Sequence, residues 1–138
     1  LTERGHNDCE LMGNRLLQQG FQPDKILVSS AKRTLQTAKD LKEVLNWDEN
    51  QVEVLSHFYL ASAEEMLGEI KKLADEHQNI AIIAHNPGMT DLFNLLGSVS
   101  LDNLPTCGMA LFEIDTDTWK QIKHHENKLC WYSWPKGN

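Results

Sequence analysis

The 138-residue chain lacks both the positive charge of a nucleic-acid-binding surface and the long apolar run of a membrane span. Its 13 lysine and arginine residues are outnumbered by 20 aspartate and glutamate residues, which leaves a formal net charge of −7. Nucleic-acid binding depends on clustered basic side chains, and a membrane span needs about 20 apolar residues in succession. We therefore expect neither nucleic acid nor a membrane as a partner.

Cysteine is also scarce, and its spacing excludes the common zinc motifs. Cys9, Cys107 and Cys130 are odd in number and far apart, which is typical of reduced thiols in a cytoplasmic protein. The chain also lacks a secretory signal, a serine nucleophile elbow, a glycine-rich phosphate loop and a dinucleotide fingerprint. We therefore expect a cytoplasmic location, no metal and no cofactor.

What the chain does contain is a short, strongly apolar run that ends at a histidine. Residues 80–84 are Ile-Ala-Ile-Ile-Ala, and His85 follows directly, before the turn Asn86-Pro87-Gly88. Such a run, bounded by turn residues, is typical of a central parallel strand that is buried on both faces. The turn is expected to leave the free N–H groups of the next helix facing a pocket. A lone histidine here could simply be bonded to backbone, but this context favours a functional role.

A second strand–turn–helix pattern lies upstream and carries an arginine. Residues 26–30 predict another strand, and Arg33 falls in the first turn of a helix expected at about residues 32–45. A cation at that position opposes the helix dipole unless an anion lies beside it. Arg33 and His85, each just after a parallel strand, are thus predicted to form one anion site.

The remaining polar candidates have simpler interpretations. The hydroxyl residues near Arg33 fit roles in caps and turns: Ser29, Ser30 and Thr37. For Thr37 we favour such a role over contact with a substrate. Four histidines are expected at the surface: His6, His77, His124 and His125. His57 follows a predicted strand and could reach a pocket.

Strand–helix alternation over most of the length predicts a single α/β domain spanning residues 1–138, a three-layer α/β/α sandwich with a mainly parallel central sheet. A short antiparallel edge is expected near the C-terminus, where residues 109–114 alternate in polarity. Helix starts are predicted after Thr2 and Ser62, and a helix stop at Gly20. In the first helix, apolar residues recur at helical spacing: Leu11, Met12, Leu16 and Leu17. The inner stripe of the second helix is expected to comprise Leu35, Ala38, Leu41 and Leu45.

Five segments, taken in order, resemble the histidine phosphatase superfamily, which has the phosphoglycerate-mutase-like fold. They are residues 1–5 (LTERG), 29–38 (SSAKRTLQTA), 83–87 (IAHNP), 104–108 (LPTCG) and 134–136 (WPK). Each motif is weak alone, but the five in order make a fairly specific signal that spans nearly the whole chain. Within the superfamily, the chain is most similar to the small SixA-type phosphohistidine phosphatases.

The resemblance implies a two-step phosphoryl transfer through a phosphohistidine enzyme intermediate, with no cofactor. Arg33 is then expected to bind phosphate, and His85 to stabilise the charge that develops on the phosphoryl oxygens. The implied partner is a protein that bears phosphohistidine, and a phosphate or sulfate ion is expected to bind in the same pocket.

One departure from the family pattern concerns the nucleophile. The family begins with a strand that ends in Arg-His-Gly or Arg-His-Ala, whereas Arg4-Gly5-His6 has a different order and opens a helix. We therefore expect the natural protein to continue upstream of Leu1, with the nucleophilic histidine on a strand at the centre of the sheet. On that expectation, the 138 residues alone are inactive.

Two alternatives to a phosphohistidine phosphatase stay open. One is an enzyme of the same fold that acts on a small phosphate ester or as a mutase, although the short chain leaves little room for insertions that cap a small-substrate pocket. The other is a non-catalytic phosphate-binding domain that lacks the nucleophile. Glu64 and Glu65 are candidates for a general acid, but they are more typical of solvated acids at a helix start.

Overall fold

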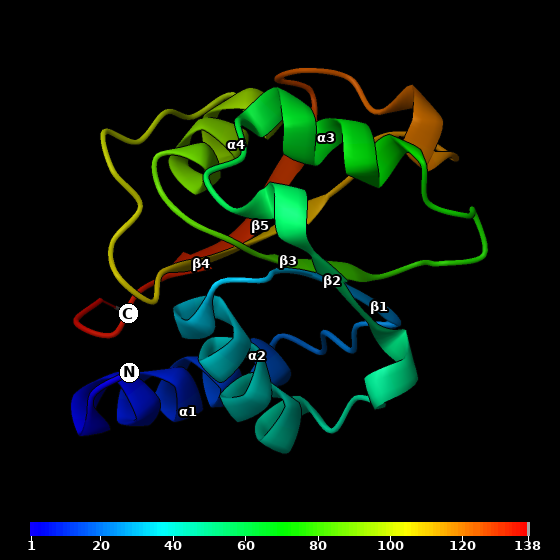
Figure 1. The fold of residues 1–138 in the computed structure, drawn as a ribbon. Helices are drawn as coiled ribbons and strands as arrows, with labels where there is room; N and C mark the ends of the chain where they lie inside the picture. Colours follow the sequence, from blue (N-terminus) through cyan, green and yellow to red (C-terminus); the bar gives the residue numbers. More distant parts are fainter. Residues whose placement is uncertain (138) are drawn as a thin grey trace.

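A parallel three-stranded sheet forms the centre of the computed structural model, which describes residues 1–137 (Figure 1). The strand order is β2-β1-β3, with bounds Val52–Leu55, Lys25–Ser29 and Ile80–Ile83. Near the C-terminus, β4 (Met109–Glu113) and β5 (Lys128–Ser133) form a separate antiparallel pair, as expected.

Helices cover both sides of these strands. Figure 1 shows α1 and α2 on one side of the parallel sheet and α3 and α4 on the other, which confirms the predicted three-layer α/β class. Their bounds are Glu3–Gln18, Lys32–Leu45, Ala63–Lys71 and Gly88–Leu96. Three short 3-10 turns are η1 (Glu49–Gln51), η2 (Ser56–Phe58) and η3 (Trp119–Gln121). Within residues 1–137, no helix has the length and apolar character needed to cross a membrane.

Local sequence signals set the ends of the helices where they were predicted. The Gly5 N–H donates to the Thr2 hydroxyl at 3.0 Å, which caps α1. Ser62 and Glu65 form a reciprocal capping box at the start of α3. Gly20 follows α1 with φ +78, a backbone conformation that favours glycine.

The buried faces of the first two helices differ in part from their apolar patterns. Leu35, expected on the inner stripe of α2, is exposed, and so are Leu11 and Leu17 of the apolar pattern in α1. On α1 the buried face comprises Cys9, Met12 and Gly13. Gly13 allows close helix packing, because a Cβ there would lie 3.2 Å from Leu41 of α2. A count of apolar positions misses this small-residue contact on the inward side of α1.

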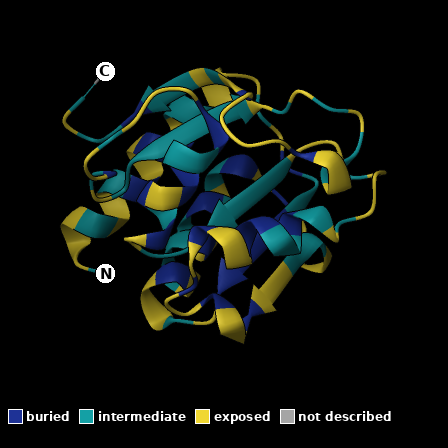
Figure 2. Ribbon diagram, turned by 90° about the horizontal axis from the view of Figure 1, so that it is seen from above, coloured by how far each residue is buried: buried dark blue, intermediate teal, exposed yellow. Residues whose placement is uncertain are grey.

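The two neighbouring strands β1 and β3 differ in burial (Figure 2). Residues 26–29 of β1 are at most 1% exposed, whereas every residue of β3 is only half-buried. The prediction that residues 80–84 form the central strand, buried on both faces, is therefore wrong. In this sheet β1 lies at the centre, and β3 has one edge paired with β1 while the other is unpaired among the described residues.

A cavity of about 870 Å³ explains the partial burial of β3. Its walls include residues of both β3 and β4, together with residues of α1, α2 and α4. The parallel sheet and the β4–β5 pair are therefore separate sheets that border a common hollow. Apolar side chains in its walls lack the contacts that bury their counterparts on β1.

Candidate functional site

The carboxyl ends of β1 and β3 bring together the two side chains that the sequence singles out. Arg33 lies in the first turn of α2, shortly after β1, and His85 lies two residues beyond the end of β3. Val28 is the register partner of Ile83, so the two strands end at the same edge of the sheet. Both Arg33 and His85 line the 870 Å³ cavity. The structure thus places them at one cavity, and their chemical roles stay predictions.

Ser29, the last residue of β1, lies directly against His85. Its side chain is fully buried, and its Oγ is 2.9 Å from Nε2 of His85. The same oxygen accepts a hydrogen bond from the Ala31 N–H at 3.3 Å. The sequence predicts only a cap or turn role for Ser29. The signal that could have revealed the contact is the parallel register, which sets the ends of β1 and β3 side by side.

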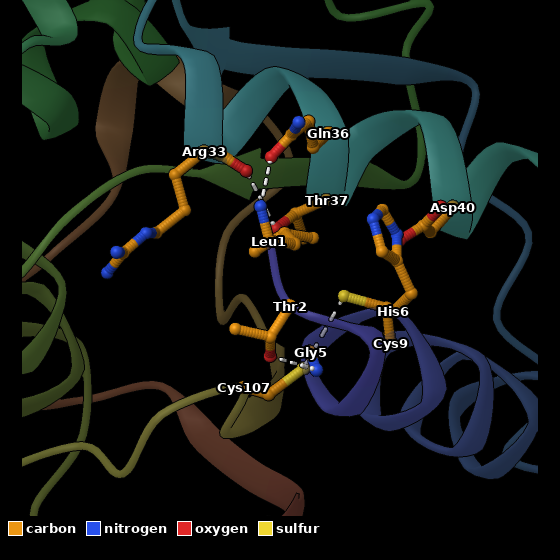
Figure 3. A network of polar contacts seen from close by, with 10 residues as sticks. All are labelled: Leu1, Thr2, Gly5, His6, Cys9, Arg33, Gln36, Thr37, Asp40 and Cys107. Carbon is orange, nitrogen blue, oxygen red and sulfur yellow. Dashed lines mark hydrogen bonds and ion pairs between the residues drawn. The ribbon is translucent and has the colours of Figure 1, made fainter.

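The Arg33 guanidinium group is exposed, and no acidic side chain among residues 1–137 pairs with it. Figure 3 shows the side chain extending away from α2, with no bond drawn to its guanidinium group. The helix start offers no compensation, since Ala31 supplies no side-chain cap and the first turn holds no acid. An anion placed there would be stabilised both by Arg33 and by the positive end of α2. Thr37 donates its hydroxyl to the Arg33 carbonyl at 3.0 Å, in keeping with the structural role we favoured for it.

The His85 ring, by contrast, is held by its neighbours. Besides the Ser29 contact, the ring packs edge-on against Tyr59, with ring centroids 5.5 Å apart. The next residue, Asn86, accepts hydrogen bonds from both the N–H and the hydroxyl of Thr90, at 3.1 and 2.7 Å. The prediction that the start of this helix presents free N–H groups to a ligand is therefore wrong for Thr90, because the Asn86 side chain already occupies it.

A second pocket, of about 250 Å³, also borders His85 and is lined by the acidic residues Glu65 and Asp91. Hydrogen bonds from the backbone and hydroxyl of Ser62 hold the pKa of Glu65 below its usual range. Glu65 is therefore ionised at neutral pH and poorly suited to donate a proton. It acts as part of a helix cap, which is the role expected of an acid at a helix start.

The other histidines contact partners outside the Arg33–His85 pair. Their partners are Asp40 for His6, Glu69 for His57, Asp24 for His77, Glu64 for His124 and the Gly97 carbonyl for His125. His57, which the sequence left as a pocket candidate, is exposed and lines neither pocket. Across residues 1–137, no three His, Cys, Asp or Glu side chains converge as metal ligands do.

Known proteins provide an independent comparison of the sequence. The profile of the Histidine phosphatase superfamily (branch 1) matches residues 1–77, more than half of the chain. An uncharacterized chloroplastic protein of Arabidopsis thaliana is 27% identical over 129 residues, which cover 88% of this chain and 59% of that protein. The chain thus spans about three fifths of the length of this curated relative.

Solved structures share the fold over nearly the whole chain. The protein histidine phosphatase SixA complexed with tungstate has a TM-score of 0.83 at 22% identity, covering 98% of this chain and 83% of that one. A protein assigned as the phosphohistidine phosphatase SixA of Agrobacterium tumefaciens has a TM-score of 0.78 at 21% identity, covering 96% of this chain and 81% of that one. A protein with the same assignment from Nakamurella multipartitia has a TM-score of 0.79 at 18% identity, covering 99% of this chain and 85% of that one. These matches support the phosphoglycerate-mutase-like fold.

Proposed function

The chain belongs to the histidine phosphatase superfamily (branch 1), and on this premise we propose that the protein hydrolyses phosphohistidine on a partner protein. One observation carries the proposal: Arg33, which has no acidic partner within residues 1–137, and His85 line one cavity, and each follows a strand that ends at the same edge of the sheet. An unpaired guanidinium beside a helix start is suited to bind the oxygens of a phosphoryl group.

The proposed roles follow from how the two side chains are held. Arg33 presents its planar fork of donors to two phosphoryl oxygens, and its exposure lets the side chain adjust to an incoming substrate. His85 stabilises the charge that grows on the phosphoryl group as the bond to the leaving imidazole breaks. Ser29 acts as a positioning residue, because its hydroxyl fixes the His85 ring before substrate binds.

The proposed reaction passes through a phosphohistidine intermediate on the enzyme. The phosphoryl group moves from the substrate imidazole to an enzyme histidine, and water then takes it from that histidine. Of the other five histidines within residues 1–137, His77 lines the cavity and the remaining four do not. His77 lies beside Asp24, just before β1, at the opposite end of that strand from Ser29. We therefore propose that the nucleophilic histidine lies outside these 138 residues, and that His85 assists it.

Two features beside His85 favour a protein substrate over a small ester. Tyr59 and Leu60 are 59% and 71% exposed, so an apolar rim is available to contact a protein surface. Glu65 is held ionised, which leaves the small pocket without a good proton donor on that side. Phosphohistidine needs little acid catalysis, because its P–N bond is labile and imidazole leaves comparatively easily.

Turnover of a phosphohistidine-bearing peptide by the full-length protein, measured against a panel of sugar phosphates, tests the proposal. We expect release of inorganic phosphate from the peptide at a higher kcat/KM than from any ester. A preference for an ester would overturn the proposal in favour of a small-molecule phosphatase or mutase of the same fold.

A second candidate function is phosphate binding without catalysis. It is favoured by a single observation, the lack of a second histidine beside Arg33 and His85 within residues 1–137. Its signature is distinct: the full-length protein would bind inorganic phosphate through Arg33 and release none from any substrate. Isothermal titration with phosphate, run beside the turnover assay, separates the two functions.

A further inference from the structure

Two cysteines that lie 98 residues apart in the sequence are in contact in the structure. The Sγ atoms of Cys9 in α1 and Cys107 in the loop before β4 are 3.7 Å apart (Figure 3). Both are free thiols, and the third cysteine, Cys130, is an exposed residue of β5. The sulfur atoms of the pair need to approach by less than about 2 Å to reach the length of an S–S bond.

The surroundings of the pair give the two sulfur atoms different chemistry. The contact with Cys107 lowers the pKa of the Cys9 thiol, burial opposes this effect, and the Thr37 hydroxyl adds to it. The same bond, with burial, raises the pKa of Cys107. The lower pKa makes Cys9 the better nucleophile of the two thiols. Cys9 is only 2% exposed at the surface, but both residues line the 870 Å³ cavity.

We propose that Cys9 and Cys107 form a redox pair, which peroxides oxidise to an intramolecular disulfide between α1 and the loop before β4. The argument rests on the 3.7 Å contact and on the cavity that both residues line. It does not depend on the phosphatase activity proposed above.

The chemistry balances with hydrogen peroxide as the oxidant. The Cys9 thiolate attacks one peroxide oxygen, so that an S–O bond forms, the O–O bond breaks and hydroxide leaves as water after protonation. The Cys107 sulfur then attacks Sγ of the Cys9 sulfenic acid, which forms the S–S bond and breaks the S–O bond. The departing hydroxide takes the Cys107 proton. In sum, two thiols and one peroxide give one disulfide and two molecules of water.

The disulfide would join the two sides of the candidate site. Cys9 lies on the face of α1 that packs against α2, the helix that carries Arg33. The loop of Cys107 is tied to the other side, since the Asn86 side chain donates to the Leu104 carbonyl at 2.9 Å. A covalent bond between Cys9 and Cys107 therefore fixes the helix pair on the Arg33 side to the loop held by the His85 side.

Oxidation of the full-length protein with hydrogen peroxide tests the proposal. We expect the loss of two thiols per chain in a thiol titration under denaturing conditions, and their recovery after dithiothreitol. Peptide mapping without reductant should show the Cys9 peptide linked to the Cys107 peptide. The midpoint of urea unfolding should rise on oxidation and return on reduction, because the cross-link restricts the unfolded chain.

Cys130→Ser is the matched control, and it should lose the same two thiols and give the same linked peptides. In Cys107→Ser, oxidation should stop at a Cys9 sulfenic acid that dimedone traps. The proposal is overturned if peroxide modifies only Cys130 or yields dimers that Cys130→Ser abolishes. It is equally overturned if Cys9 passes to sulfinic acid while Cys107 stays a free thiol in the wild-type protein.

Discussion

Two strand–turn–helix units of the same design differ in how they hold their functional side chains. In residues 25–45, which we call the arginine unit, the strand is almost wholly buried, and Arg33 is exposed with no acidic partner within residues 1–137. In residues 80–96, the histidine unit, the strand is half-buried while His85 is fixed by Ser29 and Tyr59. The closest packing therefore surrounds the strand in the arginine unit, whereas in the histidine unit specific contacts surround the functional side chain.

The difference follows from what each side chain is proposed to do. A cation that binds a phosphoryl group must stay unpaired until the anion arrives. Its position therefore has to be set by the backbone that carries it. An imidazole that stabilises developing charge must present one nitrogen in one direction, so neighbouring groups have to orient the ring. The buried strand thus positions Arg33, whereas neighbouring side chains position His85. Separate substitutions can disturb the two independently.

The largest effect is expected from Arg33→Ala, which removes the free side chain of the arginine unit. If Arg33 clamps the phosphoryl group, kcat/KM of the full-length protein for a phosphohistidine peptide should fall by about 10²–10³-fold. Arg33→Lys should restore only part of the loss, because an ammonium group lacks the planar fork.

The unfolding free energy of Arg33→Ala should stay at the wild-type value, since the exposed guanidinium has no acidic partner among residues 1–137. Lys32→Ala, an exposed neighbour, is the control for a general loss of positive charge. A loss of activity as large in Lys32→Ala would show that overall charge, and not the Arg33 fork, binds the substrate.

The next effect concerns the strands and compares Ile26→Ala in β1 with Ile83→Ala in β3. Ile26 is 0% exposed, whereas Ile83 is half-buried beside the cavity. Ile26→Ala should lower the unfolding free energy by about 2–5 kcal/mol, and Ile83→Ala by clearly less, because fewer contacts surround it. Urea unfolding measures both. Equal losses would mean that the cavity beside β3 is filled in solution.

A smaller effect is expected when the contact between the units is cut by Ser29→Ala. The lost hydroxyl frees the His85 ring, and kcat should fall by about tenfold, in line with one hydrogen bond. Inhibition by inorganic phosphate, which we assign to Arg33, should not change. Ser30→Ala, an exposed neighbour, is the control. An unchanged kcat, or a loss of phosphate affinity equal to the loss of kcat, would argue against a positioning role.

The sequence allowed the fold class, the α2 boundaries, the caps at Thr2 and Ser62 and the two strand-end residues to be predicted. These features depend on local patterns, which one stretch of chain contains in full. The burial of β3 could not be predicted, because it depends on what lies beside the strand and not on its own apolar residues. Likewise, the Ser29–His85 contact joins residues 56 positions apart and follows only from the register of two strands.

The smallest effect concerns the charge that borders the histidine unit at Glu65. Bonds from Ser62 lower the pKa of Glu65 in the folded state, so their stabilisation is present above the pKa of an unfolded glutamate. This stabilisation is lost as the pH falls through the lowered pKa of Glu65 in the folded protein. Glu65→Gln keeps an acceptor for the Ser62 N–H but does not titrate, so its unfolding free energy should depend less on pH between about 5 and 3.

Urea unfolding across that range measures the difference from wild type, with Glu64→Gln as the control that leaves the capping box intact. A Glu64→Gln profile that flattens as much as the Glu65→Gln profile would assign the acid sensitivity to general charge. A flattening confined to Glu65→Gln would instead tie it to the cap beside His85. The histidine unit would then be bordered by a carboxylate that stays ionised at neutral pH, which favours a substrate with a good leaving group.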